Sequence, residues 1–181
     1  VENMKEIGII TLYGFTVGIL GTGLGGLLSL FIKETNRILS FLLGLTGGFM
    51  LFIVTFHLLP EAFILGGLII PIIGIILGIL LIVVLENTIE KNTRPPIMKS
   101  ALLLGISIAV HNFPEGLALG SSFLTMSDFG PVLAIAMLLH NIPEGITMAI
   151  PMKINKIHPR KVLLYTILTG IPTGIGAFIG A

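Results

Sequence analysis

Two stretches of the chain carry the same run of histidine, asparagine, proline and glutamate. Residues 111–116 read HNFPEG, and residues 140–145 read HNIPEG. A partial third copy, HLLPE, begins at His57. Imidazole, carboxamide and carboxylate groups held at a fixed spacing are side chains that bind divalent metal ions.

The spacing within each copy gathers these groups on one side of a helix. Residues three and four apart in an α-helix are neighbours, so His111 and Asn112 both lie beside Glu115. The second copy repeats this arrangement with His140, Asn141 and Glu144. Each glutamate can therefore serve a histidine-lined site and an asparagine-lined site at once, which is a geometry suited to bridging two cations.

The ligand types favour transition metals. Imidazole and carboxylate suit borderline divalent ions such as zinc, iron(II), manganese, cobalt and cadmium, whereas magnesium and calcium prefer shells of oxygen alone. The chain has no cysteine, so thiolate ligands are excluded. Four-coordination is completed by the two imidazoles and two carboxylates of His111, Glu115, His140 and Glu144.

Two other interpretations of these residues are open at this stage. The groups can pair with one another as an inert polar clamp between helices, or they can hold the metal of a membrane-embedded metalloenzyme. An enzyme needs an open metal position and a general base, and the sequence has no HExxH motif. We favour a metal path over the clamp because the two copies are complete and matched.

Composition predicts the elements that must position these residues. Of the 181 residues, 54% are hydrophobic and 10% are charged, far from the roughly 25% charged residues of soluble domains. Runs of about 20 apolar residues can cross a bilayer. Six such runs predict an all-α, polytopic transmembrane helix bundle: 7–32, 38–60, 66–85, 98–124, 130–151 and 161–181.

The distribution of charge predicts the orientation of the chain. Nine of the ten lysine and arginine residues fall in or beside three connections, 33–37, 86–99 and 152–161. By the positive-inside rule these three loops are cytoplasmic and the N-terminus lies outside the cell membrane. The formal net charge of +1 gives no electrostatic case for nucleic acid as a partner.

Depth in the bilayer supports a functional site. At about 1.5 Å per residue, His111 lies roughly 18 Å from Lys99, and His140 lies roughly 15 Å from Gly130, so both are near the midplane. Facing motifs on antiparallel helices at the midplane are typical of transporter substrate sites. An ionisable side chain there costs about 2.5 kcal/mol or more, which argues for a use.

Three further residues are weaker candidates. Met50 lies at the depth of the histidine pair, where a methionine is either apolar filler or a thioether ligand. His57 and Glu61 also stack at i and i+4, but roughly 28 Å from the start of their helix and so near the outer face. For these two, a role at the entrance of a metal path and simple interfacial placement are both open.

The paired HNFPEG and HNIPEG motifs, with FHLLPEAF on the second span, resemble the ZIP family (Zrt/Irt-like proteins) of divalent metal transporters. The resemblance implies eight core spans, so residues 1–181 are expected to be a single transmembrane transporter domain that lacks the last two helices. It also implies transport of zinc and related ions into the cytoplasm, no cofactor, a homodimer, and an elevator-like motion of the first, fourth, fifth and sixth spans.

The resemblance further implies two metal sites. The first would use the four histidine and glutamate residues together with Met50. The second would use Asn112 and Asn141 with both bridging glutamates. Some family members supply a further glutamate from the sixth span, where this chain has Thr173, so the second site is expected to be weak. We therefore expect a transporter of divalent transition metal and not an enzyme.

Overall fold

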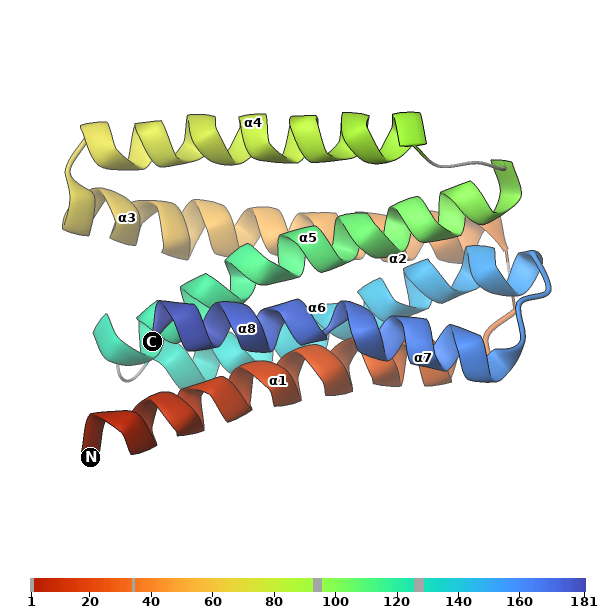
Figure 1. The fold of residues 1–181 in the computed structure, drawn as a ribbon, viewed down its shortest axis with the longest axis horizontal. Helices are drawn as coiled ribbons and strands as arrows, with labels where there is room; N and C mark the ends of the chain where they lie inside the picture. Colours follow the sequence, from red (N-terminus) through yellow and green to blue (C-terminus); the bar gives the residue numbers. More distant parts are fainter. Residues whose placement is uncertain (1, 34, 93–95, 126–128) are drawn as a thin grey trace.

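The computed structural model of the chain describes residues 2–33, 35–92, 96–125 and 129–181 (Figure 1). Within these ranges the ordered elements are helices, with no strand, which confirms the predicted all-α fold. In chain order they are α1 (Glu2–Ser29), α2 (Asn36–Ile53), the π-helical turn η1 (Val54–Leu58), α3 (Leu59–Gly66), α4 (Ile69–Asn92), α5 (Pro96–Thr125), α6 (Phe129–Ile154), α7 (Pro159–Thr169) and α8 (Ile171–Gly180).

The helices are those of a polytopic membrane protein. In the described part of the chain, four helical segments are long and apolar enough to cross a bilayer: Met4–Ser29, Asn36–Gly66, Phe129–Ile154 and Pro159–Gly180. Ile69–Val84, within α4, is a shorter apolar helix. The predicted spans 66–85 and 98–124 correspond to α4 and α5.

Short-range sequence signals set several helix ends. Thr35 precedes α2, and its hydroxyl oxygen accepts a hydrogen bond from the backbone N–H of Ile38 at 3.3 Å, as expected for an N-cap. Gly67 has φ +63° in the turn between α3 and α4, a conformation that favours glycine. At the start of α7, the ring of His158 accepts from the N–H of Arg160 at 3.3 Å.

The sixth predicted span, 161–181, is not one continuous helix. It is divided into α7 and α8 at Gly170. Pro172, two residues after Gly170, has no N–H, so the carbonyl four residues before it loses its helical partner. Proline acts differently in the second span, where Pro60 follows the π-helical turn and the helix runs on to Gly66.

The stretch 86–99 is more helical than the polar linker expected there. Helix α4 continues to Asn92 and α5 begins at Pro96, because proline is well tolerated in the first turn of a helix. Residues 93–95, which include Arg94, lie outside the described residues. So do residues 126–128 between α5 and α6.

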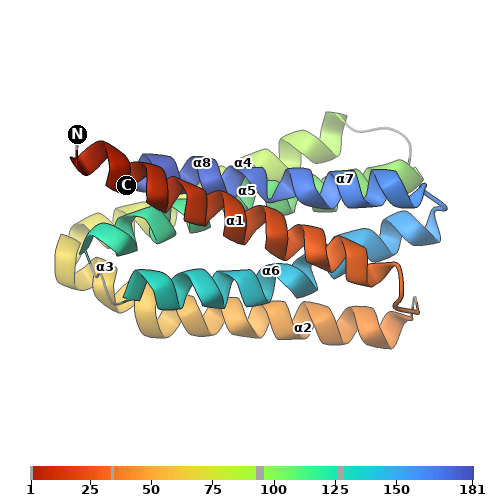
Figure 2. The ribbon, with the colours of Figure 1, turned by 90° about the horizontal axis from the view of Figure 1, so that it is seen from below.

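The helices form a central group and a flanking group. Helices α1, α5, α6 and the α7–α8 pair make the most extensive contacts with one another. Helices α2, α3 and α4 lie to one side, with α2 packed along α6 (Figure 2) and α4 outermost in Figure 1. The motif-bearing helices α5 and α6 therefore belong to the central group.

Glycine allows the central helices to approach closely. A Cβ added at Gly18 would collide with the Gly170 carbonyl, and one at Gly25 would collide with the Ile142 carbonyl. On the other side of the group, a Cβ at Gly116 would collide with the carbonyl of Thr173. Contact between helix backbones through small residues is typical of membrane bundles, and it brings α1 and α8 against the two motifs.

Candidate metal centre

Helices α5 and α6 carry the two motifs and run antiparallel (Figures 1 and 2). Pro114 lies inside α5 and Pro143 inside α6. Each proline lies three residues after its histidine and one before its glutamate, where it removes a backbone hydrogen bond. The two motifs are therefore held on facing helices, each at a point where its own helix lacks one backbone hydrogen bond.

The histidines and glutamates pair across the two helices. The Nε2 atom of His111 lies 2.5 Å from Oε1 of Glu144. In return, Nε2 of His140 lies 3.2 Å from Oε1 of Glu115. The sequence placed each histidine beside the glutamate of its own motif. In the structure the hydrogen bonds instead join one motif to the other, because the facing helix brings the opposite carboxylate to the ring.

Each imidazole has a second partner on its own helix. Nδ1 of His140 donates to the carbonyl of Ala136, one turn earlier, at 3.3 Å. The ring of His111 is likewise hydrogen-bonded to the backbone of Ser107, one turn earlier. A metal-ligating histidine typically donates its other ring N–H to such a carbonyl, which fixes the ring. Both rings are thus oriented with Nε2 toward the space between α5 and α6.

The two pairs differ in exposure. The side chain of His140 is 1% exposed and that of its partner Glu115 is 7% exposed, whereas that of His111 is 37% exposed. The ring of Phe49 on α2 covers His140, with ring centroids 5.8 Å apart. Helix α2 therefore covers the α6 side of the centre, while the side of His111 is more open.

Five buried oxygen atoms around the pairs have no hydrogen-bond partner among the described residues. They are Oδ1 of Asn112 and Asn141, Oε2 of Glu115 and Glu144, and Oγ1 of Thr173. An unsatisfied buried polar atom costs about 1–3 kcal/mol, so five in one region are a large cost unless something binds them. Oxygen atoms of these types are ligands for cations.

The two asparagines are fixed by their amide nitrogens. Asn112 donates to the carbonyl of Thr169 at 2.7 Å, where α7 ends and the helix is interrupted. Asn141 donates to the carbonyl of Val17 on α1 at 3.4 Å. These contacts leave both carboxamide oxygens free to accept. Sequence reasoning missed Thr169, although the Gly-Ile-Pro run after it signals a break that exposes a carbonyl.

Thr173 lies at the same level of the bundle. Its side chain is fully buried and lies against Gly18 of α1, while its backbone lies against Gly116 of α5. Gly116 directly follows Glu115 in the chain. The structure therefore places Thr173 close to the first motif, and its role at a second metal site stays a prediction.

The pairs do not form a closed metal cage. Across the described ranges, no three histidine or acidic side chains converge closely enough to hold an ion. Met50 is half-buried, and the side chain that α2 places on His140 belongs to its neighbour Phe49, which the sequence did not single out. A role of Met50 as a ligand stays a prediction.

His57 and Glu61 lie away from the pairs. The ring of His57 is exposed and stacks on Phe129, with centroids 5.1 Å apart. Phe129 is the first residue of α6, so this contact is roughly 16 Å along the helix from His140. Their predicted role at an entrance remains a prediction.

Comparison with known proteins identifies the family. Residues 90–181 match the model of the family described as ZIP zinc transporter. The zinc transporter ZupT of Akkermansia muciniphila is 33% identical over 91% of this chain and 72% of its own length. ZupT of Streptococcus mutans is 33% identical over 89% of this chain and 70% of its own length. ZupT of Clostridium perfringens is 28% identical over 99% of this chain and 76% of its own length. These relatives are transporters, so the alternative of a metalloenzyme is not retained, and the chain belongs to the ZIP family of divalent metal transporters.

Proposed function

We propose that this chain carries zinc, and with lower preference iron(II), cadmium, manganese or cobalt, into the cytoplasm. The ion would pass through a centre made by His111, Glu115, His140 and Glu144 on α5 and α6. Names of the relatives support zinc as the first choice. The ligand types support the wider set of borderline ions.

The observation that carries the proposal is the group of five unpartnered oxygen atoms beside the two His–Glu pairs. An inert clamp would account for the two pairs, since each histidine already has a carboxylate partner. It would give no role to the buried oxygen atoms that no described protein group reaches, each of which costs about 1–3 kcal/mol if nothing binds it. A cation that reaches these atoms would remove that cost.

The side chains would divide the task between two positions. Each imidazole faces one oxygen of the opposite glutamate, and a first position for a four-coordinate ion would form where the two pairs close on the ion. The second oxygen of each glutamate, with the carboxamide oxygens of Asn112 and Asn141, supports a second position, to which Thr173 contributes only a neutral hydroxyl. We propose that this second position binds an ion more weakly than the first.

Movement of the ion would follow from the grouping of the helices. The central group of α1, α5, α6 and α7–α8 is held by contacts at glycine, which supports its motion as one unit against α2–α4. The basic connections 33–37, 86–99 and 152–161 would face the cytoplasm. We further propose that the working form is a homodimer in the bilayer, and that residues 1–181 act as a single transmembrane transporter domain.

Uptake by proteoliposomes tests the proposal. Zinc, iron(II) and cadmium uptake would be compared for the wild type, His111→Ala and a matched control, His158→Ala, which removes an exposed histidine that caps α7. We expect saturable zinc uptake that is lost in His111→Ala and kept in His158→Ala. Equal uptake in both variants, or tight binding without any uptake, would overturn the proposed path.

A further inference from the structure

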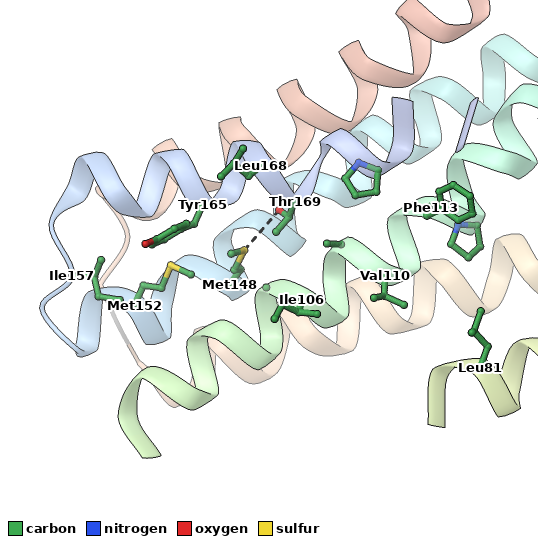
Figure 3. Close-up of a pocket in the computed structure, with 14 residues that line it drawn as sticks. Leu81, Ile106, Val110, Phe113, Met148, Met152, Ile157, Tyr165, Leu168 and Thr169 are labelled. Carbon is green, nitrogen blue, oxygen red and sulfur yellow. Dashed lines mark hydrogen bonds between the residues drawn. The ribbon is translucent and has the colours of Figure 1, made fainter. Parts of the chain in front are cut away.

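A large apolar cavity borders the first motif, since Phe113 and Pro114 help to line it, but none of the four histidine and glutamate side chains of the two pairs lines it. Its volume is about 580 Å³, within the range of about 300–1,000 Å³ that is common for small-molecule sites. Its lining comes from α4, α5, α6 and the α7–α8 pair (Figure 3). The residues that define it are Leu81, Ile106, Val110, Met152, Tyr165 and Leu168.

The wall of this cavity presents almost no hydrogen-bonding groups. The hydroxyl of Thr169 donates to the carbonyl of Thr166 on its own helix at 2.8 Å and lies 3.8 Å from the sulfur of Met148, the contact drawn as the dashed line in Figure 3. The carbonyl of Thr169 is taken by Asn112. A metal ion would find no charged ligand here, so the cavity does not extend the metal path, and its chemistry fits a hydrocarbon chain.

One end of the cavity lies beside exposed positive charge. Met152, Ile157 and Tyr165 gather at the end where α6 turns into α7 (Figure 3). Lys161 precedes Tyr165 by four residues on α7, so it lies on the same helix face, one turn closer to the loop. Lys156 directly precedes Ile157 in the loop, and both lysines are exposed.

We propose that this cavity binds one acyl chain of an anionic phospholipid, whose phosphate lies at Lys156 and Lys161. Basic groups at the end of an apolar slot between membrane helices complement a negatively charged head group. Lys153, in the same region, donates to carbonyls at and just beyond the end of α1, among them that of Ile32 at 2.9 Å. The two exposed lysines are therefore the cations that we assign to the phosphate.

None of the proposed metal ligands lines the cavity, so lipid binding can be tested without measuring transport. The chain would be reconstituted with phosphatidylglycerol or phosphatidylcholine that carries a photoreactive diazirine near the end of one acyl chain. After illumination, the labelled peptides would be identified by mass spectrometry. We expect phosphatidylglycerol to label the cavity peptides of α5, α6 and α7 more strongly than phosphatidylcholine does.

Three variants separate the head group from the tail. Lys161→Gln should reduce labelling of these peptides by phosphatidylglycerol about fivefold, the typical contribution of one basic residue at an anionic surface. Lys33→Gln, an exposed lysine after α1 that does not line the cavity, is the matched control and should change nothing. Ala109→Phe, which fills the cavity from α5, should reduce labelling by both lipids.

The proposal has clear contrary outcomes. Equal labelling by the two lipids, or equal effects of Lys161→Gln and Lys33→Gln, would show that the charge does not select the lipid. Labelling confined to the exposed α4 surface would show that the cavity takes no acyl chain. Unchanged labelling in a folded Ala109→Phe protein would likewise overturn the proposal.

Discussion

The Nε2 atom of His111 lies 2.5 Å from Oε1 of Glu144, on the neighbouring helix and not on its own. With the reciprocal contact of His140 and Glu115, this makes the centre a property of two helices together. Loss of one member affects both motifs, because its partner is then left without a hydrogen bond in a buried place.

Replacement of Glu144 by glutamine tests the carboxylate that we assign to both metal positions. Glu144→Gln keeps the shape of the side chain but removes its charge. We expect zinc affinity to fall at least about tenfold, since even outer-shell partners of a metal contribute about ten- to a hundredfold, and uptake to be lost. Titration calorimetry and proteoliposome uptake measure these effects, with normal membrane insertion as the control. Wild-type uptake in this variant would contradict the assignment.

Thr173→Val tests the second position. Valine has nearly the same shape as threonine but no oxygen, so the packing against Gly18 and Gly116 is kept. We expect the number of zinc ions bound per chain at saturation to fall while the tighter first site is unchanged. Metal analysis after equilibrium dialysis measures both. Unaltered stoichiometry would exclude the Thr173 hydroxyl as a ligand.

Metal affinity should rise with pH. Nδ1 of His140 already donates to the Ala136 carbonyl, so the bond between its Nε2 and Glu115 requires a further proton between the two atoms. A cation that takes this place must displace that proton, and ligands for metal must be deprotonated. Calorimetry in buffers of different ionisation enthalpy should therefore record proton release on zinc binding. Affinity that is equal at pH 6 and about pH 8 would contradict this expectation.

Gly25→Ala tests the packing that holds α1 on α6. A Cβ at this position meets the backbone of Ile142 and Gly145, which cannot move aside, and overpacking of this kind costs about 1–3 kcal/mol. We expect a lower midpoint of thermal unfolding in detergent. Gly48→Ala on α2, where a Cβ meets open space, is the control and should be neutral or slightly stabilising. Similar midpoints for the two variants would refute close packing at Gly25.

Lys153→Met tests the contact between the end of α6 and the end of α1. The Lys153 ammonium donates to the carbonyls of Ser29 and Ile32, which lie at and just beyond the C-terminus of α1. Hydrogen bonds to a charged group contribute about 1.5–3 kcal/mol, so the variant should unfold at lower temperature. Lys33→Met, an exposed lysine near the same end of α1, is the comparison and should have little effect.

The sequence determined the class of the protein and singled out the candidate ligands of its metal centre. Composition and run length were enough for an all-α membrane bundle, because crossing a bilayer demands about 20 apolar residues in each helix. The repeated motif was enough to single out His111, His140, Glu115 and Glu144, because polar groups are costly in such a setting. The residue types at helix ends also follow local preferences: Thr35 caps the first turn of α2 with its hydroxyl oxygen.

Only the tertiary structure decided which groups meet. Spacing along one helix pairs His111 with Glu115, but the close approach of α5 and α6 gives His111 the carboxylate of Glu144 instead. The interruption at Gly170, the carbonyl of Thr169 that holds Asn112 and the ring of Phe49 on His140 likewise depend on neighbours distant in sequence. Such contacts are set by the packing of one helix against another. The periodicity of residues within one helix does not tell which helix packs against it.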